Sequence, residues 1–165
     1  MITTSRLLLR QFSLADVPAI FALSLEEGIR RWIPDQVYRD VDEAEHVIRA
    51  LMAHTANPPQ PHVHPYVLAV EHRETGDLIG HVGLSPARGS VEIGYAIADR
   101  LQGQGLATEV VSAAAGWGVD ELALAEVLGV VAAANLPSRR VLEKAGFVLA
   151  ADEGERVVYR RVRSR

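Results

Sequence analysis

Apolar residues recur along this chain with two different spacings, and the change of spacing predicts where strands give way to helices. In residues 91–98, Val91, Ile93, Tyr95 and Ile97 alternate with smaller residues, which is the period of a strand. In residues 106–121 apolar residues recur every three or four positions, which is the period of a helix. The stretch therefore predicts a strand, a short glycine loop and a helix, in that order.

The same spacings predict a mixed α/β (α+β) arrangement over the rest of the chain, which we treat as one domain spanning residues 1–165. The patterns predict strands at 5–10, 66–71, 78–84, 91–98, 127–133, 147–149 and 156–162, and helices at 13–25, 42–52, 106–121 and 137–145. Residues 28–38 break the pattern, and the prolines of residues 57–65 predict a loop. Because the strands at 66–98 have short connections, we expect them to form an antiparallel meander.

The turn between the second and third of these strands sets which polar residues become neighbours. We take residues 86–89 as the turn, so that Leu84 pairs with Val91. This register places His81 opposite Gly94 and Glu92 opposite Gly83, on one face of the sheet. His81 and Glu92 are then diagonal neighbours about 7–8 Å apart at Cα, and a small substrate could reach both.

The loop between strand and helix predicts a site for phosphate. Gly103 and Gly105 can adopt positive φ and let the backbone approach a ligand closely. The helix that follows presents unpaired N–H groups at the positive end of its dipole. A second helix, opened by Asn135 and Pro137, is expected to begin at the same end of the sheet.

Composition excludes several classes of function. The chain has no cysteine, so thiolate catalysis, Cys-based zinc sites and disulfides are ruled out. The net charge of −4 argues against a nucleic-acid partner, and no apolar run is long enough to cross a membrane. His62 and His64 have no third ligand nearby in sequence, so we expect no metal. We expect a cytoplasmic protein and leave a homodimer open.

Four segments carry a resemblance to a known family. The run 102–107, Gln-Gly-Gln-Gly-Leu-Ala, resembles the Q/R-x-x-G-x-G/A signature of the GNAT N-acetyltransferase superfamily. The segment 135–147 resembles the N-x-x-S…E-K-x-G-F segment of the same superfamily. Residues 4–10 and 93–95 are similar to the RimJ/RimL branch, which acetylates the N-termini of ribosomal proteins.

The resemblance implies a fold, a donor and a set of site residues. The implied fold is a mostly antiparallel sheet of about six or seven strands, with helices on both faces and a splayed strand pair at the CoA site. The implied donor is acetyl-CoA. Its pantetheine arm would contact the backbone of Tyr95, Ala96 and Ile97 and the side chain of Asn135. Its pyrophosphate would lie on the loop and first helical turn, namely Gln102, Gly103, Gln104, Gly105, Leu106, Ala107 and Thr108.

The catalytic groups are less completely matched. Where many members of the superfamily carry a tyrosine as general acid this chain has Leu142, and where some carry a glutamate base it has Val130. Ser138 matches the position that the RimL branch is thought to use as acid. The candidate catalytic residues are therefore Ser138 as acid and Glu92 or His81 as base.

The acceptor is expected to be a primary amine. An amine must be neutral to attack the thioester, and at pH 7 deprotonation costs about 1 kcal/mol for a peptide α-amine but about 4–5 kcal/mol for a lysine. The candidate bases Glu92 and His81 are weak, and this favours a protein N-terminal α-amine as the acceptor.

Other functions stay open from the sequence. A polyamine, an amino acid or an antibiotic could be the acceptor instead, and a catalytically silent acyl-CoA-binding module is a further alternative. A nicotinamide-dependent oxidoreductase is disfavoured, because the glycine loop follows antiparallel strands rather than the first strand of a βαβ repeat.

Overall fold

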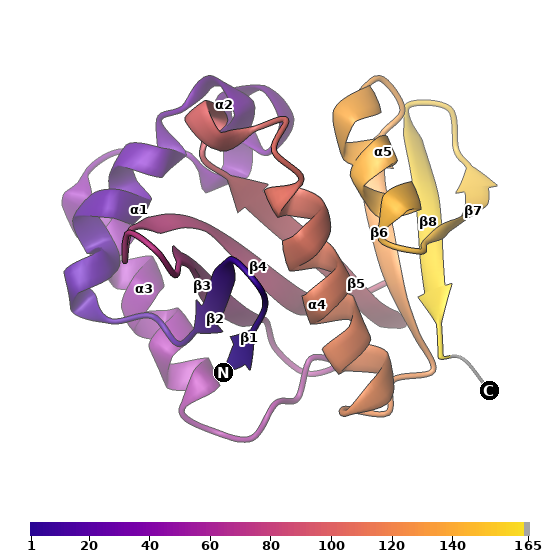
Figure 1. Cartoon of the computed structure of the whole chain (residues 1–165), viewed down its shortest axis with the longest axis horizontal. Coiled ribbons are helices and arrows are strands. Elements are labelled where there is room, and N and C mark those ends of the chain that lie inside the picture. The colour runs from indigo at the N-terminus through magenta and orange to yellow at the C-terminus, as the bar shows by residue number, and fades with distance from the viewer. Residues whose placement is uncertain (164–165) are drawn as a thin grey trace.

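One sheet runs through the part of the chain that the computed structural model describes, residues 1–163 (Figure 1). It has eight strands in the order β1-β2-β3-β4-β5-β6-β8-β7. The strands are β1 (Ile2–Thr3), β2 (Leu7–Arg10), β3 (Tyr66–His72), β4 (Leu78–Ala87), β5 (Ser90–Ile97), β6 (Glu126–Ala132), β7 (Val148–Asp152) and β8 (Arg156–Val162). The helices are α1 (Val17–Ser24), α2 (Glu27–Trp32), α3 (Val41–Thr55), α4 (Leu106–Asp120) and α5 (Leu136–Lys144).

Helices cover both faces of this sheet, as the sequence predicted. Strand β3 shows the division, because alternate side chains of a strand point to opposite faces. Its Leu68 and Val70 belong to the larger core, which includes Val110 of α4, whereas Ala69 belongs to a smaller core with Ile20 of α1 and Ile48 of α3. Helices α4 and α5 therefore lie on one face, and α1 and α3 lie on the other.

Most predicted elements are present, and two expectations need correction. The sheet has one strand more than the six or seven expected, because Ile2–Thr3 pairs with Leu8–Leu9 as a separate short strand. Residues 28–38 were expected to be irregular, but they contain most of α2. This helix shows no apolar period because only Ile29 is buried in it.

The register of the β4–β5 hairpin differs from the prediction. Strand β4 continues through Pro86 to Ala87, and the turn is only Arg88 and Gly89, with φ of 54° and 73°. Positive φ at both central residues is the geometry of a tight hairpin turn whose twist matches the strands. Leu84 consequently pairs with Ile93 rather than Val91, which shifts every pair by two residues. A shift of two preserves the face of each side chain but changes its neighbours.

The sheet divides between β5 and β6. These two strands are parallel and share one register pair, Glu92 with Leu128, after which they diverge toward the start of α4 and α5 (Figure 1). The expected splayed strand pair is therefore present. Because the strands are parallel, and the next helix after β5 is α4 and the next after β6 is α5, the two helices begin at the same end of the sheet.

Candidate functional site

A row of free backbone donors lies where the glycine loop enters α4. Gly103 and Gly105 have φ of 77° and 78°, and Gly105 caps the helix. Within the described residues, the N–H groups of 103–108 make no hydrogen bond, and residues 102–105 are exposed. Such a row of N–H groups, at the positive end of a helix dipole, is suited to an anion. The predicted phosphate cradle thus has the expected backbone geometry.

The N-terminal segment holds this cradle from outside. The Arg6 guanidinium donates to the carbonyl of Gln104 at 2.8 Å and to Glu109 Oε2 at 2.7 Å. Glu109, in the first turns of α4, also accepts from Thr4 Oγ1 at 2.6 Å and from the Arg6 backbone N–H at 2.9 Å. Burial by itself would raise the pKa of Glu109, but these hydrogen bonds outweigh it and lower the pKa to about 2. The carboxylate is therefore charged and fixed at neutral pH.

The start of α5 presents a second polar group at the same end of the sheet. Asn135 caps the helix, its Oδ1 accepting from the Ser138 N–H at 3.2 Å. The Ser138 hydroxyl oxygen lies 2.6 Å from the hydroxyl oxygen of Tyr95 on β5. Tyr95 and Ser138 thus connect β5 to α5, the helix that follows β6.

Leu142, which stands where many family members have a tyrosine acid, is part of the core. It is 2% exposed. A Cβ on Gly129 of β6 would come within 2.8 Å of its Cδ2 atom, so the two residues pack directly against each other. Leu142 fills space above the sheet and has no polar group to offer.

The two candidate bases lie on the other face of the sheet, but not side by side. In the observed register His81 is opposite Ala96, and Glu92 is opposite Ser85. Four residues of strand, roughly 13 Å, separate the two positions. The predicted diagonal contact between His81 and Glu92 is therefore wrong, because the hairpin turn is shorter than expected.

Their surroundings also differ. Glu92 lies at the point where β5 and β6 part, and burial raises its pKa despite the opposing influence of Arg88 and Arg156. Burial lowers the pKa of His81 to about 4. At neutral pH His81 is uncharged and a weak base, whereas Glu92 is a stronger base than an ordinary glutamate.

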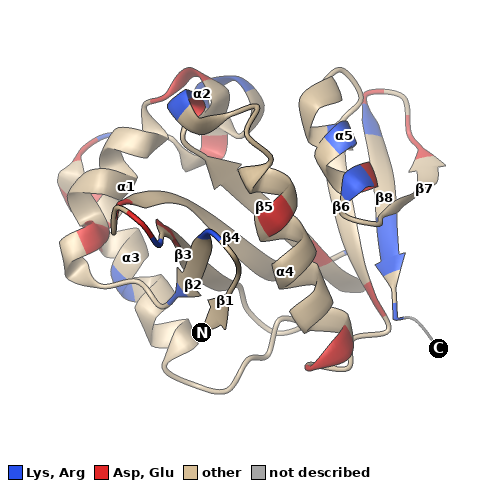
Figure 2. Cartoon of the chain, viewed as in Figure 1, with Lys and Arg blue, Asp and Glu red and all other residues tan. Residues whose placement is uncertain are grey.

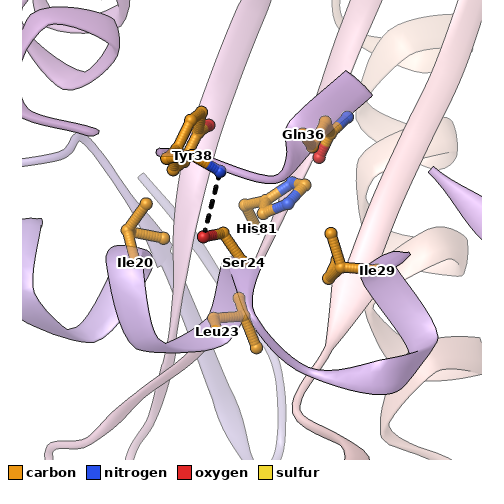
Figure 3. A pocket seen from close by; sticks show the side chains of 7 residues that line it. All are labelled: Ile20, Leu23, Ser24, Ile29, Gln36, Tyr38 and His81. Carbon is orange, nitrogen blue, oxygen red and sulfur yellow. Dashed lines mark hydrogen bonds between the residues drawn. The ribbon is translucent and has the colours of Figure 1, made fainter. Parts of the chain in front are cut away.

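His81 borders a small cavity between β4 and the N-terminal helices (Figure 3). The cavity measures about 10 Å³, which is near the space that one water needs. Its polar edge includes Ser24, whose hydroxyl accepts from the Tyr38 backbone N–H at 3.3 Å. The lining residues are Ile20, Leu23, Ser24, Ile29, Gln36, Tyr38 and His81. In this structure the cavity is too small for an amine substrate.

One group of basic residues lies on the β6 side of the split. Figure 2 shows this group on α5 and β8, across the divergence from α4, with further basic residues on α2. Positive charge at this position would attract an anionic ligand that approaches the glycine loop. Within residues 1–163 no three His, Cys, Asp or Glu side chains are grouped as metal ligands. None of the helices described is both long and apolar enough to cross a membrane.

Sequence reasoning missed two features of this site. Arg6 and Glu109 are 103 positions apart, and only the packing of β2 beside α4 brings them together. The Tyr95 hydroxyl is the second feature, because the resemblance points only to the backbone of that residue. The strand alternation contained a signal for it, since Tyr95 shares the face of Val91 and Ile93, toward α4 and α5.

Comparisons with known proteins identify the family. Residues 6–148 match the family model described as an acetyltransferase (GNAT) domain. The Bacillus subtilis (strain 168) protein YoaA, named as an uncharacterized N-acetyltransferase, is 31% identical over 87% of this chain and 80% of its own length.

Solved structures share the fold. A GNAT-family acetyltransferase from Bacillus anthracis superimposes with a TM-score of 0.81, at 21% identity, covering 98% of this chain and 97% of the other. RimL, the ribosomal L7/L12 α-N-protein acetyltransferase in complex with coenzyme A, superimposes with a TM-score of 0.79 at 17% identity, covering 97% and 96%. The glycine cradle, the divided sheet and these matches agree: the chain belongs to the GNAT acetyltransferase family and is an acyltransferase.

Proposed function

We propose that this protein transfers an acetyl group from acetyl-CoA to a primary amine, by direct attack of the amine on the thioester. The observation that carries the proposal is the row of unpaired N–H groups in residues 103–108, beside two diverging strands. A pyrophosphate would supply the acceptors that these donors lack. The coenzyme A bound to RimL, which shares the fold, supports the same donor.

The pantetheine arm and the thioester of acetyl-CoA would lie along the gap between β5 and β6. Within residues 1–163, β5 beyond Glu92 has no partner strand on the β6 side, so the backbone of residues 95–97 is available to the amide groups of pantetheine. Asn135 would contact the same arm from the start of α5. The backbone N–H near Ile97 would hold the thioester carbonyl, and Ser138 would protonate the departing sulfur.

Glu92 is the base that the geometry supports best. It lies at the closed end of the split and faces away from α4, whereas Tyr95 and Ser138 lie on the α4 side. The two substrates would thus approach the gap from opposite faces of the sheet. Burial raises the pKa of Glu92, and this makes it better able to accept a proton from the amine.

The acceptor class follows from the cost of deprotonation. Deprotonation at pH 7 costs about 1 kcal/mol for a peptide α-amine, which one carboxylate can offset. For a lysine it costs about 4–5 kcal/mol. We therefore propose a protein N-terminal α-amine as acceptor. Polyamines, amino acids and amine antibiotics are the small-molecule alternatives.

The test is acetyl transfer to a panel of amines, measured as release of free CoA thiol. The panel contains short peptides with free N-termini, the same peptides with blocked N-termini and an internal lysine, a polyamine and an aminoglycoside. We expect the free N-terminal peptides to react fastest. Faster reaction of the blocked lysine peptides or the polyamine would contradict the α-amine proposal. It would still support acetyl transfer to a primary amine.

One observation favours a second candidate, an acyl-CoA-binding module without catalysis. Leu142 is 2% exposed at the position where many family members carry a tyrosine acid, and it has no proton to give. Binding of acetyl-CoA without transfer to any amine of the panel would support this candidate.

A further inference from the structure

The hydroxyl groups of Tyr95 on β5 and Ser138 on α5 form a short polar contact across the split. Tyr95 Oη is 2.6 Å from Ser138 Oγ and 3.3 Å from the Ser138 carbonyl oxygen. Ser138 Oγ makes no other hydrogen bond within the described residues. When Tyr95 donates to Oγ, the hydroxyl proton of Ser138 is left free to point at a ligand in the split.

The backbone fixes both partners. Ser138 is in the first turn of α5, where Asn135 accepts its N–H, so its side chain cannot drift from the helix start. Tyr95 lies three residues beyond Glu92, on the part of β5 that no longer pairs with β6. Its ring packs against the larger core, which leaves the hydroxyl as its one polar group.

The chemistry of the two hydroxyls explains why a pair is useful. A serine hydroxyl is a very weak acid, so alone it is a poor match for a thiolate of pKa near 8.5. A phenol, with an ordinary pKa near 10, is much closer. Burial raises the pKa of Tyr95, and the hydrogen bond to Ser138 opposes this rise.

We propose, given the acetyl transfer above, that Tyr95 is a positioning residue that supplies a proton through Ser138. As the C–S bond breaks, the electron pair goes to sulfur, Ser138 Oγ gives its proton to that sulfur, and Tyr95 Oη gives its own to Ser138. The tyrosinate regains a proton from water. The amine nitrogen, as its bond to the acetyl carbon forms, loses one proton to Glu92 or water, so protons balance. Tyr95 on β5 thereby supplies the proton that the apolar side chain of Leu142 cannot supply.

The first test is a double-mutant cycle on kcat. Tyr95→Phe removes only the hydroxyl, and we expect it to lower kcat about 10- to 100-fold with little change in KM for acetyl-CoA. Ser138→Ala should lower kcat similarly, and the double variant should be no slower than either single variant, because the residues act as one unit. The matched control is Tyr66→Phe on β3, whose ring packs on Trp117, and it should keep the parent kcat. Unchanged kcat in Tyr95→Phe, or fully multiplicative losses in the double variant, would overturn the relay.

The second test needs no acceptor. A donor pair that stabilises the departing thiolate also stabilises the thiolate of bound CoA, so the thiol pKa of CoA should be lower in the complex than in solution. Ultraviolet absorbance of the thiolate measures it, and Tyr95→Phe should raise that pKa by about one unit, equal to the expected tenfold change. A thiol pKa that Tyr95→Phe leaves unchanged would refute the relay. Absence of acetyl transfer by the unaltered protein would instead refute the proposed function, while the thiol titration still decides the relay.

Discussion

At the scale of single residues, the environment decides which titratable groups can take part in chemistry. The sequence offers Glu92 and His81, which lie on neighbouring strands, as equivalent candidate bases. Burial makes Glu92 a better proton acceptor and His81 a worse one, because it penalises the charged form of each. The same physical cause therefore separates a candidate base from a packing residue.

Glu92→Gln tests the role of the carboxylate. We expect kcat/KM to fall about 100-fold near neutral pH, and by less as the pH rises and the solution itself deprotonates the amine. The measurement is kcat/KM against pH, beside Glu126→Gln, which alters a carboxylate at the start of β6. A loss that stays constant with pH would show that Glu92 positions the substrate without taking its proton.

His81 should make stability depend on pH. Its pKa is about 4 in the folded protein, against an ordinary value of 6.5, so between those values the unfolded chain binds a proton that the folded chain does not. The free energy of unfolding is unaffected above about pH 6.5 and should fall by up to about 3 kcal/mol as the pH drops toward 4. Urea unfolding of His81→Gln should show a correspondingly smaller fall over this range. Identical pH dependence in both proteins would contradict a neutral His81 with a lowered pKa.

At the scale of elements, the start of α4 combines an unusual backbone conformation with side-chain hydrogen bonds that hold it in place. Glycine supplies the positive φ that turns the N–H groups of the loop outward. The segment Thr4–Arg6, just before β2, then fixes the first turns of the helix through Glu109. One substitution tests the glycine loop, and another tests the hydrogen bonds of Glu109.

Gly105→Val should abolish acetyl-CoA binding, because a β-branched residue is strained at φ 78° and its Cβ would lie 3.6 Å from the Arg6 guanidinium that holds the loop. Gly76→Val is the matched control. Gly76 has φ 75° and open space around it in the β3–β4 turn, so the strain is similar and the cradle is intact. Calorimetric titration with acetyl-CoA should show binding by the control alone. Normal binding by Gly105→Val would show that the loop is only a turn.

Glu109→Gln should destabilise the protein by about 1–2 kcal/mol at pH 7, since it weakens a partly exposed network of charge-assisted hydrogen bonds. The pKa of Glu109 is lowered to about 2 from 4.5, so this stabilisation is complete above about pH 4.5 and is lost as the pH falls toward 2. Denaturant unfolding at pH 7 and pH 3 should give a smaller difference between variant and parent at pH 3. Glu45→Gln, which affects an exposed pair with Arg49, should cost less than about 0.5 kcal/mol.

At the scale of the whole molecule, the divided sheet organises the site. Helices α4 and α5 begin at the open end of the split on one face, and Glu92 faces the opposite side at the closed end. A donor on the first face and an acceptor on the second could meet through the gap between β5 and β6. The larger core holds both halves together, since it joins residues of β2–β5 to residues of β6 and β8.

Acetyl-CoA should therefore stabilise the fold as a whole. A ligand at 100 times its Kd adds about 2.7 kcal/mol, which corresponds to a rise in Tm of roughly 5–10 °C for a chain of this size. Thermal unfolding with and without acetyl-CoA measures it, and NADH at the same concentration should have little effect. Stabilisation by NADH alone would contradict the assignment of the donor.

The sequence by itself determined the elements and the cradle. Periodicity is a local property, so it located the long helices and the strands of the meander, and the glycines at 103 and 105 predicted the positive φ that the loop adopts. The resemblance of its motifs to the GNAT superfamily also implied the splayed strands. These features depend on residues that are close in the chain.

Only the tertiary structure decided how distant groups meet. The two-residue turn at Arg88 and Gly89 set a register that keeps His81 away from Glu92, and no local pattern distinguishes it from a four-residue turn. The pairs Tyr95 with Ser138 and Arg6 with Glu109 depend on where strands and helices pack, across 43 and 103 positions of sequence. Burial, and with it each pKa, is likewise a property of the packed molecule, because desolvation depends on neighbours from every element.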